Sequence, residues 1–329
     1  MKVVLGFAFL YVLLVAFLAR KKLHELHPRK FFLETWLAAD REAAMARADR
    51  MGEMVYRSGA VSRPMRFDWH AVVAYVTLAV VLTLQEYFGD RASFDRLRDR
   101  GWVIEWGGGP NRPPTHHLKI FGPLRWLTSE RWGELYGLSW WVFTRWIGYV
   151  VIPVLIVWIW RKRLRDFGLS FKGFLSHAWI YALFFGIVLI AVVLVSNTSE
   201  FANYYPFYRQ ANRSWRDFWT WELLYASQFL ALEFFFRGFL IFSGRRSMGA
   251  GVIVAMVVPY CMIHYGKPWA EAMAAILAGV VLGTLSLKTR SIWSGFLIHV
   301  TVAISMDMAA LVQTRGLPGG FHLPASWGF

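Results

Sequence analysis

"LEFFFRGFL", residues 232–240, lies within a long apolar stretch and carries one carboxylate, Glu233, and one guanidinium, Arg237. The surrounding run, 220–242, is long enough to cross a bilayer as a helix. Charged side chains are costly in hydrocarbon and usually face a bundle interior or a wet cavity. The stretch therefore predicts a membrane-spanning helix that carries either a functional site or a structural ion pair.

The composition of the whole chain favours a membrane protein. Of its 329 residues, 57% are hydrophobic, above the share usual for a soluble domain, and 18 are tryptophans, which favour the headgroup zone. The net charge is +15, but the basic residues lie between apolar runs. This pattern favours anionic lipid headgroups over nucleic acid as the partner. The single cysteine, Cys261, excludes an intrachain disulfide.

The pattern predicts an all-α, polytopic membrane bundle of about eight transmembrane helices. The first is expected to be a retained anchor with its N-terminus outside, because its basic residues follow the apolar run and no cleavage site appears. The expected spans are 2–19, 70–88, 140–160, 176–196, 220–242, 249–265, 269–287 and 291–312.

The charges between the spans set the expected orientation. With the N-terminus outside, the inside segments hold 20 of the 36 Lys and Arg residues, including "RKRLRDFG" (161–168) and "GRRS" (244–247). Short basic loops lie preferentially on the cytoplasmic side, so the protein is expected in the cell (inner) membrane as a multi-pass protein. These inside segments are 20–69, 161–175, 243–248 and 288–290.

Two long loops and a division of the chain follow from this arrangement. Residues 23–68 are expected to form an amphipathic cytoplasmic helix or helix pair, and 89–139 an outside cap around a Gly/Pro-rich turn. Most of the unexplained polar residues lie in the last four spans. We therefore divide the chain into an N-terminal accessory part, 1–219, a four-helix core, 220–313, and a short tail, 314–329.

Six ionisable residues within the last four spans are candidates for a site, and each has a structural alternative. Glu233 and Arg237 are four residues apart on one helix face and could be a packing ion pair. The two histidines could lie at an interface or bond a backbone carbonyl, and the two remaining acids could mark a water boundary or pair with Arg145. The six candidates are Glu233, Arg237, His264, Glu271, His299 and Asp307.

These residues are expected at two depths. At about 1.5 Å per residue, three lie some 10 Å closer to the inside end than the others. Arg237, His299 and Glu233 form the inner layer, and His264, Asp307 and Glu271 the outer layer. One tilted wet cavity could contain both layers, and a carboxylate with two histidines can activate water for peptide hydrolysis.

Other chemistries find less support in the sequence. Two histidines with carboxylates can bind zinc, but no H-E-x-x-H motif is present and the ligands would come from separate helices. No G-x-S-x-G motif or phosphate-binding loop occurs. No cofactor is expected, although a divalent metal is not excluded.

Three motifs resemble those of the CPBP family (CAAX-processing and bacteriocin-processing, or Abi) of intramembrane proteases. They are "EFFFRGFL" (233–240), "YCMIHYGKP" (260–268) and "LAGVVLGTLSLKTRSIWSGFLIH" (277–299). The family pattern is E-E-x-x-x-R, then F-x-x-x-H, then H-x-x-x-N or H-x-x-x-D. The resemblance covers about 220–312. It implies that Glu233, Arg237, His264 and His299 are site residues, with Tyr260 at the Phe position.

The chain departs from the family pattern at two positions. Leu232 replaces the first glutamate, which in the family activates water, and Ala303 replaces the last Asn or Asp, assigned to the oxyanion side. Glu233 or Glu271 is then the expected base, with Asp307 assisting, and Glu271 is preferred if Arg237 locks Glu233.

The favoured hypothesis is an intramembrane, glutamic-type endopeptidase, with or without the assistance of a metal. It would hydrolyse a peptide bond in a membrane-associated or C-terminally anchored protein through Glu- and His-activated water. The expected partners are that substrate and the lipid bilayer, with no nucleic acid. One alternative is a catalytically degenerate relative that serves as a membrane scaffold or immunity factor; another is a transporter, although no inverted repeat favours it.

Overall fold

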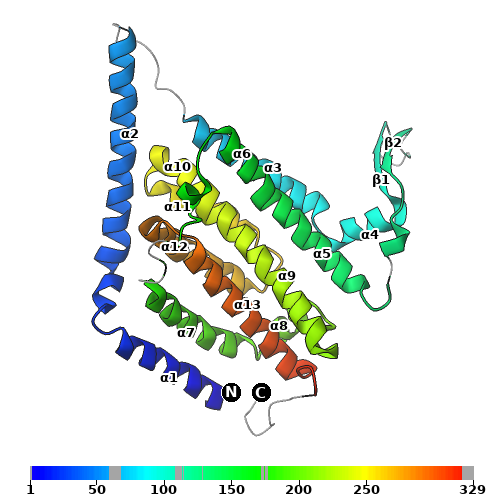
Figure 1. The fold of residues 1–329 in the computed structure, drawn as a ribbon. Coiled ribbons are helices and arrows are strands. Elements are labelled where there is room, and N and C mark those ends of the chain that lie inside the picture. Colours follow the sequence, from blue (N-terminus) through cyan, green and yellow to red (C-terminus); the bar gives the residue numbers. More distant parts are fainter. Residues whose placement is uncertain are drawn as a thin grey trace.

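The computed structural model describes residues 2–58, 68–107, 113, 115–127, 129–171, 174 and 177–320. It is a bundle of mostly antiparallel helices with one small hairpin at its edge (Figure 1). Six helices are long and apolar enough to cross a membrane, and two shorter apolar helices accompany them. The all-α, multi-pass architecture expected from the sequence is confirmed, while a count of eight complete crossings stays a prediction.

The eight apolar helices follow the expected spans closely. Two of them are compound, because a π-helical turn joins an earlier helix to a later one in each: η4 (Ile147–Val151) and η8 (Phe234–Leu240). The helices are α1 (Lys2–Leu18), α3 (Trp69–Phe88), α5 (Gly133–Trp146) with α6 (Ile152–Ile159), α7 (Ala178–Val195), α9 (Trp215–Glu233) with α10 (Ile241–Met248), α11 (Gly251–Met262), α12 (Trp269–Thr289) and α13 (Trp293–Thr314).

The compound helix α9–η8–α10 is the centre of the bundle. In the 18-residue stretch of this helix that was compared with the other spans, 72% of the residues are buried, whereas the share is 28–44% in the other five long spans. The outer helices instead expose large apolar side chains such as Phe7, Leu155 and Leu277, whose outward position suits lipid contact. Polar groups on α9–η8–α10 are therefore shielded by protein on nearly all sides, unlike those on peripheral helices.

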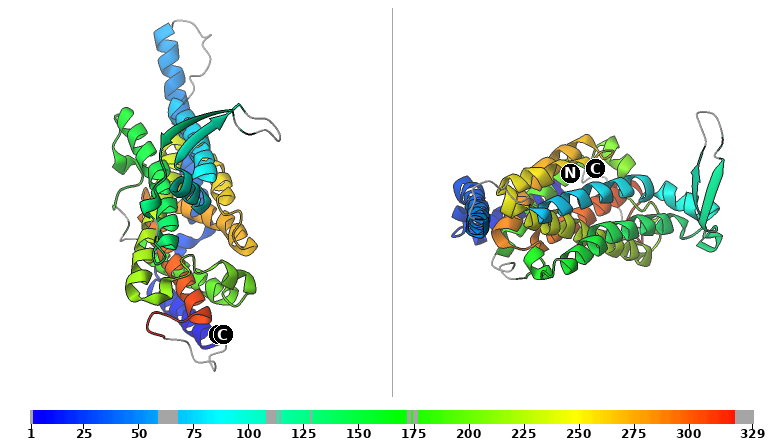
Figure 2. Two further views of the ribbon diagram at one scale, coloured as in Figure 1. Left: turned by 90° about the vertical axis from the view of Figure 1, so that its right-hand side faces the viewer. Right: turned by 90° about the horizontal axis from the view of Figure 1, so that it is seen from above.

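The two loop sets predicted from charge gather at opposite ends of the bundle (Figures 1 and 2). At one end, Ala250 N–H donates to Asp40 on α2 (Glu34–Ser58) at 2.8 Å, and Ile292 N–H donates to the Gly168 carbonyl at 3.0 Å. At the other end, Arg209 N–H donates to Glu134 at 3.0 Å. The grouping agrees with the expected sidedness; which end faces the cytoplasm stays a prediction.

Both long loops contain regular structure. Within 23–68, a 3₁₀ turn, η1 (Leu23–Leu26), and a π turn, η2 (Arg29–Leu33), precede α2, which lies across the end of the bundle (Figure 1). In 89–139, α4 (Arg91–Arg100) leads to an antiparallel hairpin of β1 (Trp102–Trp106) and β2 (His116–Phe121). This hairpin was not predicted from the sequence. The Gly/Pro turn could be recognised, but the strands that pair on either side of it are only a few residues long and leave a weak pattern.

The remaining short elements connect the helices. Part of the expected tail, 321–329, and part of each long loop, including 59–67, lie outside the described residues. The connecting turns are η3 (Arg125–Leu127), η5 (Leu164–Phe167), α8 (Ser199–Tyr204) and η7 (Ala211–Arg213).

Candidate active site

Glu233 and Arg237 form a fully buried ion pair at the centre of the bundle. Arg237 Nη1 lies 3.0 Å from Glu233 Oε1, and the exposed fractions of both residues are 0%. The pair spans the junction between α9 and the π-helical η8, and such π turns occur often at functional sites. A charge left alone here would be strongly destabilising, so each side chain offsets the cost of burying the other.

Two aromatic rings complete the setting of the ion pair. The Arg237 guanidinium carbon lies 3.8 Å from the centre of the Tyr260 ring on α11, in cation–π contact. Phe236 packs edge-on against the same Tyr260 ring at 5.5 Å. The backbone is held as well, because the Ser286 hydroxyl of α12 donates to the Arg237 carbonyl at 3.1 Å. Contacts from α11 and α12 therefore fix Arg237 in place.

His299 of α13 joins this group directly. Its Nδ1 lies 2.7 Å from Glu233 Oε1, and its Nε2 lies 2.9 Å from the Tyr260 hydroxyl. The ring stacks on Phe229 at 5.3 Å, and 16% of its side chain is exposed. Because Nδ1 faces a carboxylate, it carries a proton, and a neutral ring then accepts from Tyr260 through Nε2.

Gly295 makes the approach of α13 to Glu233 possible. A Cβ at this position would lie only 2.2 Å from Glu233 Oε2, a buried oxygen with little room to move. We expect Gly295→Ala to displace Glu233 and to reduce both thermal stability and activity. Gly251→Ala is the matched control, because nothing lies within 4 Å of its added Cβ. A Gly295→Ala protein with the melting temperature and activity of the control would contradict this packing.

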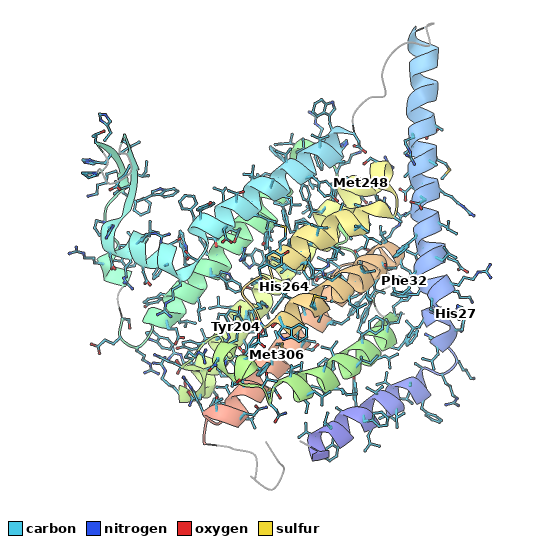
Figure 3. The ribbon with its side chains drawn as sticks, turned by 180° about the vertical axis from the view of Figure 1, so that it is seen from behind. His27, Phe32, Tyr204, Met248, His264 and Met306 are labelled. Atoms are coloured by element: carbon cyan, nitrogen blue, oxygen red, sulfur yellow. The ribbon has the colours of Figure 1, made fainter. Side chains whose placement is uncertain are left out.

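His264, at the end of α11, lies on the other side of Tyr260. Its Nδ1 bonds the Tyr260 carbonyl at 2.8 Å, and its ring centre lies 4.8 Å from that of Tyr260. A carbonyl only accepts, so Nδ1 carries the proton and Nε2 of the neutral ring is an unprotonated acceptor. His264 is partly exposed, and Figure 3 shows it well away from the end of the bundle where Met248 and Phe32 lie.

Glu271 and Asp307 belong to a second polar set, nearer the other end of the bundle. Glu271 accepts from Lys267 Nζ at 2.6 Å and from the Tyr205 hydroxyl at 2.7 Å. Burial, the largest cause, and nearby anionic groups raise the pKa of Tyr205 well above its ordinary value, so the phenol keeps the proton that it donates. Asp307 accepts from the Trp221 indole N–H at 2.8 Å. Asp307 is thus held by Trp221 rather than by Arg145.

The two layers expected from helix depth are therefore present, but their membership differs from the expectation. Glu233, Arg237, Tyr260 and His299 form one group, the Glu233 group. His264 contacts Tyr260 and so joins this group, although its depth in the sequence suggested the outer layer with Asp307. Neither of the two described pockets is lined by residues of the Glu233 group. Depth counted along the sequence could not reveal that α11 ends early, at Met262, and that the chain turns back there.

Several residues of these sets were missed in the sequence, among them Glu222, Gly295 and Tyr205. Glu222 is 1% exposed beside Asp307, and it lies three helical turns before Glu233 on the same helix. This spacing is visible in the sequence and could have marked Glu222 as a candidate on the same helix face as Glu233. Gly295 and Tyr205 carried no comparable signal, because their roles depend on which helix packs against them.

The two residues that depart from the family pattern also have apolar surroundings in the structure. Leu232 is 5% exposed and packs in the largest core cluster, and Ala303 is 5% exposed in the cluster around Trp221. Among the described residues, no group of three or more His, Cys, Asp and Glu side chains is arranged to hold a metal ion. Arg237 beside the Glu233 carboxylate also disfavours a cation there.

The fold defines a multi-pass helical membrane protein with a buried carboxylate–arginine–histidine group. Residues 214–305 match the family model described as "Rce1-like: Type II CAAX prenyl endopeptidase Rce1-like", which belongs to the CPBP proteases. No curated protein and no solved structure matches the chain significantly. The resemblance read from the motifs is thus confirmed over these residues. In general terms it implies intramembrane proteolysis of the CAAX type.

Proposed function

We propose that the protein is an intramembrane endopeptidase that cleaves a membrane-associated protein, such as one anchored through a prenylated C-terminus. The observation that carries the proposal is the contact of one buried carboxylate, Glu233, with both Arg237 and His299 inside the matched region. Buried charges brought together at the centre of a bundle, at a cost in solvation, are more typical of sites than of packing.

The hydrogen-bonding capacity of the group supports a site that accepts another polar group. Beyond the ion pair and the His299 contact, no hydrogen bond of good geometry reaches the Glu233 carboxylate or the Arg237 guanidinium from the described residues. Buried polar groups are almost always satisfied in folded proteins. A water molecule or a peptide group of the substrate is the partner that this arrangement can take.

In the proposed reaction, His264 is the general base. Its Nε2 takes a proton from water as the water oxygen attacks the scissile carbonyl, and the same proton then passes to the leaving amine. This role follows from its tautomer, since the Tyr260 carbonyl holds the proton on Nδ1. His264 thus takes over the role of the first family glutamate, whose position Leu232 fills.

The Glu233 group stabilises the charge that develops on the carbonyl oxygen. Glu233 lies 2.7 Å from His299 Nδ1 and orients the ring so that Nε2 faces the Tyr260 hydroxyl. As charge develops on the carbonyl oxygen, the Tyr260 hydroxyl can turn its proton from His299 Nε2 to the oxyanion. Glu233 is then an electrostatic partner of His299 rather than the base.

Glu271 is the competing candidate for the base, and one substitution separates the two. Lys267 and Tyr205 already occupy the two carboxylate oxygens of Glu271. We therefore expect Glu271→Gln to change kcat by no more than about threefold, below the usual effect of removing a general base. A loss of about a hundredfold in proteoliposomes would instead make Glu271 the base. Glu200→Gln, at the same end of the bundle, is the control for a lost surface charge.

The wider assignments are parts of the same proposal. The four-helix core, 220–313, carries the reaction, the segments of 1–219 support it, and the tail, 314–329, follows. We place the protein in the inner cell membrane, acting without a cofactor or nucleic acid. The direct test is cleavage of a lipid-anchored reporter peptide by the purified chain in proteoliposomes, compared with a variant at Glu233.

A degenerate, non-catalytic relative is the second candidate. The buried apolar contacts of Leu232 and Ala303 favour it, because the core has filled two positions that hold polar groups in the family pattern. This candidate requires that function survive loss of both His264 and Glu233 wherever the protein still folds. Its site would then be an ion pair that only positions α9 against α13.

A further inference from the structure

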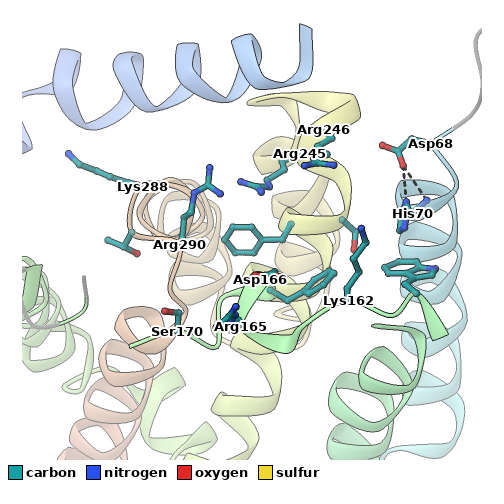
Figure 4. Close-up of a pocket in the computed structure, with 15 residues that line it drawn as sticks. Asp68, His70, Lys162, Arg165, Asp166, Ser170, Arg245, Arg246, Lys288 and Arg290 are labelled. Carbon is teal, nitrogen blue, oxygen red and sulfur yellow. Dashed lines mark hydrogen bonds and ion pairs between the residues drawn. The ribbon is translucent and has the colours of Figure 1, made fainter. Parts of the chain in front are cut away.

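A cavity lies away from the Glu233 group, at the end of the bundle crossed by α2. It has a volume of about 820 Å³ and is open to the surface. Figure 4 shows it between α10, the end of α12 and the segment that follows α6. Six basic side chains line it, against two acidic ones. The basic residues are Lys162, Arg165, Arg245, Arg246, Lys288 and Arg290.

The protein's own carboxylates neutralise only part of this charge. Glu42 of α2 pairs with three of the arginines at the edge under α2: Arg245 at 3.2 Å, Arg290 at 3.5 Å and Arg246 at 4.0 Å. The lining carboxylates are Asp68, which pairs with His70 at 3.6 Å, and Asp166. Within the described part of the chain, neither Lys162 nor Arg165 forms an ion pair within 4 Å. An excess of positive charge therefore remains inside a concave surface.

The cavity lies at the depth expected for lipid headgroups. Exposed aromatic side chains surround this end of the bundle: Trp69 is 68% exposed, Trp158 75% and Phe171 65%. Such a belt marks the interface between hydrocarbon and water. Trp160 and Phe167 form an apolar part of the lining beside the cations. A ligand with a phosphate group and an acyl chain would meet both surfaces at once.

We propose that this cavity binds the phosphate of an anionic phospholipid headgroup. Several guanidinium groups converge on the cavity, and guanidinium matches phosphate through paired N–H donors. The same chemistry would accept a soluble phosphate compound, but the aromatic belt and the apolar lining favour the lipid. The inference does not rest on the proposed proteolysis, since it concerns binding at a separate site.

Occupancy of the cavity would couple to the helices that carry the Glu233 group. Arg245 and Arg246 lie on α10, the continuation of the helix that carries Glu233 and Arg237. Lys288 and Arg290 lie at the end of α12 and just after it, shortly before His299. A headgroup that binds both sets would hold α10 against the start of α13, which is the contact that brings His299 to Glu233.

The test uses the full-length protein in detergent, with thermal unfolding measured as phosphatidylglycerol is added in mixed micelles. Phosphatidylcholine is the neutral reference lipid, and glycerol phosphate is the soluble ligand. The test variant is Lys162→Gln/Arg165→Gln, whose side chains are exposed and whose loss should leave the fold intact. The matched control is Lys21→Gln/Lys22→Gln, which removes the same charge at the same end but outside the cavity.

We expect phosphatidylglycerol to stabilise the wild-type protein and the control alike. Its apparent affinity for Lys162→Gln/Arg165→Gln should fall about tenfold or more, because each basic residue near an anionic lipid surface contributes to binding. Glu42→Gln, which frees Arg245 and Arg290, should strengthen the affinity. Equal responses of all four proteins would overturn the proposal. Equal stabilisation by glycerol phosphate would overturn the lipid as the ligand.

Discussion

Replacing Glu233 by Gln is expected to abolish cleavage of a membrane-anchored substrate, with a fall in kcat/KM of about 10²–10⁴. The introduced amide could still hydrogen-bond to His299, but it lacks the negative charge that polarises and orients that ring. The same change leaves Arg237 as a buried charge without its counter-ion, which costs about 3–5 kcal/mol of folding free energy. The measurement is cleavage in proteoliposomes together with thermal unfolding of the same preparation.

A double variant separates catalysis from folding. Glu233→Gln/Arg237→Met removes both charges, and replacing a buried ion pair by uncharged groups is often neutral for stability. We expect it to regain most of the lost melting temperature and none of the lost activity. If it cleaves at more than about a tenth of the wild-type rate, the Glu233–Arg237 pair is structural and the proposed reaction is wrong.

His264→Ala is expected to produce the second large effect, a fall in kcat of about 10²–10⁴ with little change in folding stability. The ring is partly exposed, and its hydrogen bond goes to a carbonyl of its own helix, so its loss should cost about 1 kcal/mol. Because burial lowers the pKa of His264 to about 3, the wild-type pH–rate profile should fall only near that pH, and the variant should lack this acidic limb, which a purely structural histidine would not affect. These quantities are measured by steady-state kinetics across pH.

His264→Gln provides the sharper comparison. The glutamine amide can still donate to the Tyr260 carbonyl, but it cannot take a proton from water. Activity restored by His264→Gln would show that the ring only positions α11. Tyr265→Phe, at the neighbouring and 69% exposed position, should cleave within about twofold of wild type.

The sequence alone determined the fold class and most of the helix positions. Apolar runs of bilayer length can form little other than spanning helices, since lipid offers no partner for backbone N–H and C=O groups. The runs at 70–88 and 269–287 became α3 and α12, each with one end unchanged and the other moved by one or two residues. The hairpin of β1 and β2 was missed, because its few ladder pairs leave no strong pattern in a loop rich in Gly and Pro.

For the site, the sequence alone predicted the contact of Glu233 with Arg237 and the resemblance to one family. The spacing of Glu233 and Arg237 placed both on one helix face, and the ion pair follows from that local geometry. The three motifs pointed to the family that residues 214–305 match. Both depend on residues close together in the chain, which is the range over which sequence patterns carry structural information.

How the separate helices combine could be seen only from their packing in three dimensions. The contact of His299 with Glu233 depends on Gly295, whose missing side chain lets α13 approach the carboxylate. Glu271, an equal candidate in the sequence, is bound instead by Lys267 and Tyr205. Side-chain spacing fixes which face of a helix a group occupies, whereas the rotation and depth of each helix against its neighbours are set by packing across the whole bundle.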